Sequence, residues 1–470
     1  MEENRTMETR KENKMGVMPV GKLLINVSLP MMISMFVQAL YNVVDSIFVA
    51  QVGDSALAAV SLAFPVQMLM VAVSVGTGVG INSLLSRRLG EKRFDDANKA
   101  ATNGVFLCVA SSVVFALFGL FFATPFFRAF TADETIVQMG VQYLSICTIF
   151  SLGVFVQVAM ERILQATGVT IYNMLMQGAG AITNIILDPI LIFGWFGLPA
   201  MGVAGAAVAT VIGQFVAMGL GILFNIKKNH EVSMSFKGFK PDGRIIGEIY
   251  KVGVPSIIMQ AIGSVMNIGM NKILIMFNAT AVNVFGVYFK LQSFIFMPVF
   301  GLTNGMIPIV GYNYGARKKE RIKGTIRYSI LFALAIMAVG TFLFQAFPEM
   351  FLSLFNASPE MIRIGTFALR IISLNFLPAA VGIVMSSVFQ AVGNGVLSMI
   401  LSITRQVGVL LPVAYVFAHT IGLDAVWWAF PISEVVSFIV CLTMYRYVNN
   451  KYFKNLSPVH EQGQAEPIAE

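Results

Sequence analysis

The chain carries the same pattern of long apolar runs twice. Positions 225 residues apart often hold the same residue, as Pro30 and Pro255 do, and Gln165-Ala166-x-Gly168 is repeated at Gln390-Ala391-x-Gly393. Further pairs at this offset are Asn42 and Asn267, Ala56 and Ala281, Phe64 and Phe289, Gln67 and Gln292, Gly76 and Gly301, Gly80 and Gly305, and Gly90 and Gly315. Two like halves built of apolar runs are typical of secondary transporters.

The composition requires a membrane. Hydrophobic residues make up 57% of the 470 positions and charged residues only 12%, whereas soluble domains carry about 25% charged residues. No water-soluble fold of this length could bury so much apolar surface. The net charge is +8, but its basic residues lie in short loops between the apolar runs, where they orient the chain in the bilayer. We therefore expect no nucleic-acid partner.

Twelve runs are long enough to span a bilayer, which takes about 20 apolar residues. We expect an all-α polytopic membrane protein with twelve transmembrane helices in two six-helix lobes. The expected spans are 24–50, 57–84, 99–123, 135–160, 170–194, 202–225, 250–276, 282–309, 327–347, 360–388, 396–418 and 425–447.

The loops predict the orientation. The loops that follow even-numbered spans are rich in Lys and Arg, and the loops that follow odd-numbered spans are poor in them. The positive-inside rule therefore places both termini in the cytoplasm. Six spans per half make the repeats parallel, related by a pseudo-two-fold axis along the membrane normal. We expect a cytoplasmic tail at 1–23 without a cleavable signal peptide, lobes at 24–225 and 250–448, a cytoplasmic linker at 226–249, and a cytoplasmic tail at 449–470. The polar end Ser457–Glu470 is expected to be disordered.

Asp45 is the first candidate site residue. Gln38, Asn42 and Asp45 follow i, i+4, i+7 spacing and share one helix face. A carboxylate inside a span is expensive and marks a function by default. The alternative is an interfacial anchor, since Asp45 lies roughly 7–8 Å from the outer end of its span at 1.5 Å per residue.

A second polar group is expected at the same depth. Asn184 and Asp188 lie side by side at i, i+4 spacing, and Thr210 reaches a comparable level on the next span. Together with Asp45 these oxygens suit Na⁺, or a proton shared between two carboxylates. The alternative is that Asp188 pins a helix end before Pro189 and that Thr210 bonds a backbone carbonyl.

The remaining charges inside spans are placed in the second half, at Lys272, Lys290, Arg405 and Glu434. Lys272 can extend its amine toward the interface, and Arg405 and Glu434 are interpreted as a structural ion pair. Candidate cavity-lining residues are Gln38, Tyr41, Asn42, Lys290 and Gln292. The three cysteines, Cys108, Cys147 and Cys441, are interpreted as free buried thiols.

Glycines inside the spans are assigned to helix packing. Gly76-x-Gly78-x-Gly80 resembles a nucleotide loop but lies within an apolar run, where small residues allow close helix contact. No phosphate-binding loop ending in Gly-Lys-Ser/Thr occurs in the sequence. We therefore expect no enzyme activity, no ATPase partner and no cofactor. Abundant Met (28) and Phe (39) could line an adaptable apolar cavity.

These motifs together resemble the multidrug and toxic compound extrusion (MATE) transporters. The resemblance covers most of residues 20–450 and is closest to the bacterial MepA-like branch. It rests on Pro30, Tyr41-Asn42-Val43-Val44-Asp45, Ser86–Gly90, Gln165-Ala166-Thr167-Gly168, Asn184-x-x-x-Asp188-Pro189 and Ala206-Ala207-Val208-Ala209-Thr210. It implies a first-lobe cation site at Asp45, Asn184, Asp188 and Thr210. Some branches also use acids on spans 7 and 10, which this chain lacks.

Three functions are weighed. The first is a monomeric plasma-membrane exporter that exchanges amphipathic organic cations for Na⁺ or H⁺ by alternating access. The second is a flippase for a lipid-linked precursor, which would be expected to line its cavity with several basic residues to hold phosphate. The third is an ion channel, disfavoured because no charged ring or filter loop is repeated symmetrically.

Overall fold

The computed structural model describes residues 12–454 and 456, and every regular element in that part of the chain is a helix. The polar end Ser457–Glu470, expected to be disordered, and most of the expected N-terminal tail (1–11) lie outside the described residues.

The first half consists of helices that follow one another with short connections. They are α2 (Lys14–Val17), α3 (Val20–Val52), α4 (Asp54–Gly90), α5 (Phe94–Phe121), α6 (Ala123–Phe130), α7 (Glu134–Ile149), α8 (Leu152–Ala166), α9 (Ile171–Phe193), η1 (Trp195–Gly197) and α10 (Val203–Lys228).

The second half repeats this order. Its helices are α11 (Gly243–Leu274), α12 (Ala279–Gly315), α13 (Lys319–Ala346), α14 (Pro348–Ser353), α15 (Pro359–Ser373), α16 (Phe376–Ala391), α17 (Gly395–Ile403), η2 (Thr404–Leu410), α18 (Leu411–Thr420), α19 (Leu423–Val426), α20 (Ala429–Val448) and η3 (Asn449–Phe453). Both η2 and η3 are π-helical.

Twelve membrane spans account for the described helices. Ten helical segments are long and apolar enough to cross a bilayer, and two bent pairs complete the set. The pair α7 and α8 bends by 42° and the pair α15 and α16 by 50°. The breaks at Phe150 and Asn375 are 225 residues apart, so even this irregularity is repeated. The predicted all-α fold with twelve helices in two lobes is confirmed.

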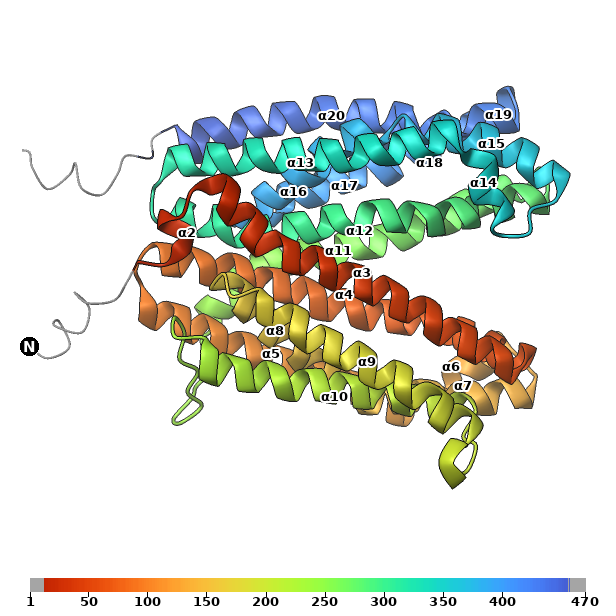
Figure 1. The fold of residues 1–470 in the computed structure, drawn as a ribbon, viewed down its shortest axis with the longest axis horizontal. Helices are drawn as coiled ribbons and strands as arrows, with labels where there is room; N and C mark the ends of the chain where they lie inside the picture. The colour runs from red at the N-terminus through yellow and green to blue at the C-terminus, as the bar shows by residue number, and fades with distance from the viewer. Residues whose placement is uncertain (1–11, 455, 457–470) are drawn as a thin grey trace, which may run out of the picture.

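The two lobes contact each other through their first two spans. The second span of each lobe packs on the first span of the other, α4 on α11 and α12 on α3. Figure 1 shows the lobes side by side at the end that carries α2 and diverging toward the end that carries α14. We call these the α2 end and the α14 end.

Repeated glycines make these contacts close. A Cβ on Gly76 of α4 would lie 2.8 Å from the backbone nitrogen of Ile257 in α11. A Cβ on Gly305 of α12 would lie 2.7 Å from the Cα of Ser28 in α3. Such distances leave no room for any side chain, which confirms that these glycines serve helix packing and not nucleotide binding.

The short helix α2 is hydrogen-bonded to both lobes. Just before it, Asn13 Nδ2 donates to the carbonyl of Thr167 in the first lobe, at 3.2 Å. In the second lobe, Asn313 Nδ2 and the Arg321 guanidinium each donate to the carbonyl of Met15, at 2.9 Å. The Met15 side chain is fully buried. The α2 segment therefore bridges the lobes at the α2 end.

Candidate cation site in the first lobe

The site is built on α9 and α10. Asn184 and Asp188 are one helical turn apart on α9, and both side chains are buried. With its amide oriented so that each atom has a partner, Asn184 donates to Asp188 Oδ2 at 3.2 Å. Its oxygen then accepts from the backbone N–H of Thr210 at 3.1 Å and from the Thr210 hydroxyl at 3.3 Å. The amide thus ties the carboxyl group of α9 to the hydroxyl of α10.

Asp45 completes the group from α3. Helix α3 packs against α9, and the carboxyl groups of Asp45 and Asp188 interact electrostatically across this contact. One oxygen of Asp45, Oδ1, is buried without any hydrogen-bond partner. The structure therefore brings together all four residues that the sequence predicted, Asp45, Asn184, Asp188 and Thr210.

The close pair of carboxyl groups requires a positive charge. Two interacting carboxylates repel each other, so either they share a proton or a metal cation neutralises the pair. The orphaned Asp45 oxygen, the second carboxyl group and the Thr210 hydroxyl form an oxygen set of the kind that hard cations prefer. Within the described residues there is no cluster of three or more His, Cys, Asp or Glu, so no site typical of zinc accompanies it.

Polar residues that the sequence analysis did not assign to the site lie beside Asp45. Gln67 on α4 donates to the Tyr143 hydroxyl on α7 at 3.1 Å, and to Cys147 Sγ at 3.7 Å. Tyr143, Cys147 and Tyr41 all interact electrostatically with Asp45. Single polar residues in apolar runs carry little signal in a sequence. The one available clue was the repeat, which pairs Gln67 with Gln292.

Of the candidate lining residues, only Tyr41 interacts with the carboxyl pair. It is half-buried on α3, and its contact with Asp45 is electrostatic. The side chains of Gln38 and Asn42 are exposed on the same helix. Lys290 is exposed on α12 with its amine 5.9 Å from the centre of the Phe355 ring, and Gln292 is half-buried. Among the described residues, none of these four has a hydrogen bond to the carboxyl groups.

One prediction about buried charges was wrong. Not all remaining charges are in the second lobe, because Glu161 and Arg162 on α8 are buried at 4% and 3% exposure. The expected fourth span ended at residue 160, whereas α8 continues to Ala166. Gln165 and Gln177 donate to the Glu161 carboxylate at 2.9 and 2.7 Å. Arg162 reaches across to Asn304 of the second lobe at 3.3 Å.

The three cysteines are free and buried, as predicted. Arg405 and Glu434 form the predicted ion pair, with 3.8 Å between Arg405 NH1 and Glu434 Oε1.

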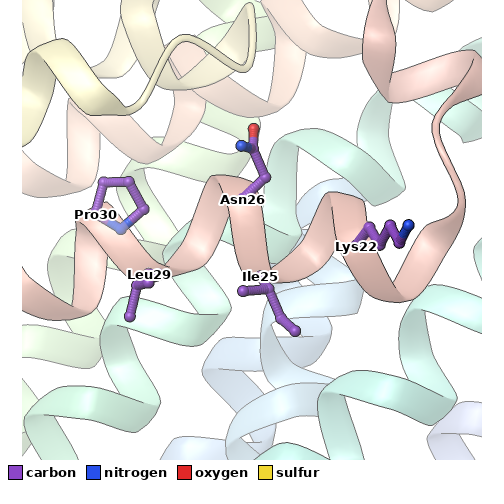
Figure 2. A pocket seen from close by; sticks show the side chains of 5 residues that line it. All are labelled: Lys22, Ile25, Asn26, Leu29 and Pro30. Atoms are coloured by element: carbon purple, nitrogen blue, oxygen red, sulfur yellow. The ribbon is translucent and has the colours of Figure 1, made fainter.

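A separate pocket of about 400 Å³ lies along α3. Figure 2 shows its lining side chains, all from this helix: Lys22, Ile25, Asn26, Leu29 and Pro30. Pro30 precedes Asp45 by 15 residues, or about 22 Å along a helix at 1.5 Å per residue. The pocket is therefore a depression in one helix surface and no part of the carboxyl site.

The sequence matches the MatE family profile at residues 30–190 and 255–416, once in each lobe. The chain belongs to the MatE family. The members of this family are transporters and not enzymes. The two matched segments coincide with the two structural repeats, and the first contains Asp45, Asn184 and Asp188.

Relatives of this MatE protein cover nearly its whole length. The multidrug export protein MepA of Staphylococcus haemolyticus is 28% identical over 428 residues, which is 91% of this chain and 93% of that protein. MepA of Staphylococcus aureus strain MSSA476 is 27% identical over 421 residues, 88% of this chain and 91% of the relative. The predicted resemblance to MATE transporters of the MepA-like kind is confirmed.

Solved structures share the fold. A structure described as the outward-facing conformation of a multidrug resistance MATE family transporter has a TM-score of 0.89 at 28% identity. The match covers 95% of this chain and 100% of that chain. A MATE structure described as straight has a TM-score of 0.88, and one described as bent has 0.84.

Proposed function

We propose that this MatE protein is a secondary active multidrug exporter that exchanges amphipathic organic cations for Na⁺ or H⁺. The observation that carries the proposal is the pair of carboxyl groups at the half-buried Asp45 and the buried Asp188, joined through Asn184 to Thr210. A transporter needs a site whose charge changes during the cycle. The two carboxyl groups must take up a cation to be stable together. The neighbouring polar groups of the protein would hold that cation in place.

The proposed cycle follows from linkage. A cation that enters from outside neutralises the pair and removes the negative charge that holds a cationic cargo. The cargo then leaves to the outside. Cargo that binds from the cell interior favours release of the coupling cation inward, because the coupling free energy between two ligands is reciprocal. The same carboxyl groups therefore serve the ion and the cargo in alternation.

The cargo class is inferred from charge and from apolar surface. The first-lobe acids favour cations, and the Met- and Phe-rich composition favours flat, apolar cargo with low selectivity. The relatives named as multidrug export proteins support this inference. Gln38, Tyr41, Asn42, Lys290 and Gln292 are proposed to line the cargo path. A flippase of lipid-linked anions is disfavoured because the first-lobe site presents carboxyl groups instead of basic residues.

The orientation and the location are part of the proposal. The protein is placed in the plasma membrane as a monomer with both termini in the cytoplasm. The α2 end, which also carries the basic loops after α4 and α12, would then face the cytoplasm, and the α14 end the outside. The acids lie in the parts of α3 and α9 that are near the α14 end, which a cation from outside would reach first.

The test is transport in proteoliposomes of purified protein. A fluorescent cation such as ethidium is followed under an imposed Na⁺ gradient and, separately, under a pH gradient. Export driven by one of these gradients is expected, and the gradient that works identifies the coupling ion. Failure of both gradients, together with movement of a fluorescent anionic lipid, would support the flippase instead.

A second measurement tests the shared site. Equilibrium binding of ethidium to the purified protein should weaken as Na⁺ or acidity rises, because the ion and the dye need opposite charge states of the pair. Binding that neither ion affects would contradict the proposed competition. An Asp45→Asn/Asp188→Asn protein provides the control, since its dye binding should be insensitive to both ions.

A further inference from the structure

The second lobe contains its own buried carboxylate, Glu434 on α20. Its side chain is 6% exposed, and Arg405 NH1 lies 3.8 Å from its Oε1. This oxygen is buried without a hydrogen-bond partner. The ion pair is therefore long and incompletely satisfied, unlike the hydrogen-bonded carboxylates of Glu161 and Asp188.

The repeat offset assigns the pair to positions near the first-lobe cation site. At the offset of 225 residues, Glu434 corresponds to Ala209, the neighbour of Thr210. Arg405 corresponds to Gly180, one helical turn before Asn184. The first-lobe carboxylates have no counterpart in the second lobe, since Met270 stands at the position of Asp45 and Leu411 or Val413 at that of Asp188. In this region the second lobe therefore has one acid and one arginine, where the first lobe has two acids.

Within residues 12–454, no positive group other than Arg405 is found to interact with Glu434. Besides Arg405 from η2, the titratable groups that interact with it are Tyr288 from α12 and Cys441 from α20. On the side of α16, Glu434 faces a glycine. A Cβ on Gly382 would lie 3.4 Å from Glu434 Oε1. Among the described residues, Arg405 thus holds the only positive charge paired with this carboxylate.

Arg405 is held by an unusual backbone. Residues Thr404–Leu410 form a π-helix inside the span, between the α-helices α17 and α18. Such π-helical turns insert an extra residue and are frequent at functional sites. The Arg405 side chain is 29% exposed although it lies in the middle of a span, so the charged end of the pair is the accessible one.

We propose that Glu434 is a latent cation site and that Arg405 is its built-in occupant. The guanidinium fills, as a tethered cation, the place that an exchangeable cation would fill in the first lobe. The second lobe of the natural protein then exchanges no ion. A neutral residue at position 405 would leave the buried carboxylate without a counter-charge, which is unfavourable enough that it must take up a proton or a small cation.

The experiment uses the full-length protein with the first-lobe site silenced by Asp45→Asn and Asp188→Asn. In this background Arg405 is replaced by Gln and, separately, by Met, two uncharged side chains of comparable length. Saturable binding of radioactive Na⁺ is measured first. Protons released by the purified protein between about pH 5 and about pH 9 are measured second, against the parent background.

Both neutral variants are expected to gain about one exchangeable Na⁺ or one titrating proton per protein, as one freed carboxylate requires. Arg405→Lys should gain neither, because the charge is retained. Combining Arg405→Gln with Glu434→Gln should abolish the gain. These readouts need no transport, so a failed prediction here is distinguishable from a failure of the proposed export function.

Two results would overturn the proposal. The first is folded Arg405→Gln or Arg405→Met protein that binds no additional cation and titrates no additional proton. The second is failure of both neutral variants to fold while Arg405→Lys folds normally, because a latent site must accept a free cation in place of the tethered one. In that case the pair would be a structural ion pair only.

Discussion

At the scale of residues, the first-lobe site depends on one amide. The Asn184 side chain is hydrogen-bonded to both Asp188 and Thr210, and its orientation is set because only one arrangement gives each amide atom a complementary partner. Asp45 approaches from another helix and keeps one oxygen unpaired. The site is therefore hydrogen-bonded on its α9 and α10 side and has an unpaired acceptor oxygen on its α3 side.

The first prediction concerns the charge of Asp45. Asp45→Asn keeps the side-chain volume but removes one of the two carboxylates, so no cation is shared between two acids. We expect gradient-driven dye export to fall at least about tenfold, the loss that corresponds to about 1.4 kcal/mol. Protein yield and the elution profile in detergent should stay unchanged. Export at the rate of the unmodified protein would show that Asp45 is only an interfacial anchor.

The second prediction concerns coupling within the site. Double-mutant cycles of Asp45→Asn with Asp188→Asn, and of Asp188→Asn with Thr210→Val, are expected to be strongly non-additive. Groups in one hydrogen-bonded network typically show interaction energies of about 0.5–3 kcal/mol. The quantity measured is the affinity for the coupling ion. Losses that add within about 0.5 kcal/mol would assign independent roles to the two carboxyl groups.

A third prediction follows from the residues that the sequence analysis missed. Tyr143→Phe removes the hydroxyl that accepts from Gln67, and it leaves the Gln67 amide without this buried partner. Because Tyr143 contacts Asp45 electrostatically, the half-point of ion-dependent dye binding should shift by several-fold, while dye affinity without ions stays constant. The control is Tyr172→Phe, at a ring that packs on Phe224 away from the site, and it should leave the half-point unchanged.

At the scale of helices, the glycines of the first and second spans decide how closely the lobes approach. Their spacing predicted close packing, and the structure assigns them to specific partners on the opposite lobe. The sequence could not reveal those partners, because a small-residue pattern does not say which helix lies opposite. It also could not reveal the π-helix of η2, since no residue type marks where an extra residue enters a helix.

The fourth prediction tests this packing. Gly305→Ala places a methyl group 2.7 Å from the Cα of Ser28, so the lobes must move apart or α12 must shift. Overpacking of this kind costs about 1–3 kcal/mol, and we expect a clearly lower melting temperature in detergent. At Gly219 on α10 a Cβ would meet no atom within 4 Å, so Gly219→Ala should not lower the melting temperature. Equal melting temperatures for the two variants would contradict the assigned contact.

At the scale of the whole molecule, composition and repetition were sufficient to predict twelve spans in two lobes. The carboxyl site followed because Asp45, Asn184, Asp188 and Thr210 are rare polar residues at matching depth. The sequence analysis did not predict the buried charges of Glu161 and Arg162, because the apolar run stops at residue 160. In the structure, tertiary hydrogen bonds keep the polar end of α8 buried. Burial of charges by partners from distant helices has no local sequence signature.

The fifth prediction concerns orientation. Phe196 is 88% exposed in the loop before α10, and Lys237 is exposed in the connection before α11. A single cysteine at position 196 should react with a membrane-impermeant maleimide on intact cells, and one at position 237 only after the cells are opened. The natural cysteines are buried, so the unmodified protein is the control for background labelling. The reverse labelling pattern would show that the protein has the opposite orientation in the membrane. The proposed exchange would then run in the opposite direction.

The α2 segment makes the two ends of the molecule unequal. Any motion that separates the lobes at the α2 end must either break the bond from Asn13 to Thr167 or release Met15 from Asn313 and Arg321. No such strap joins the lobes through a described segment at the α14 end, where they already diverge. Separation of the lobes at the α2 end therefore has an additional activation barrier. The time that the protein remains open at this end depends on how quickly the α2 segment binds to the lobes again.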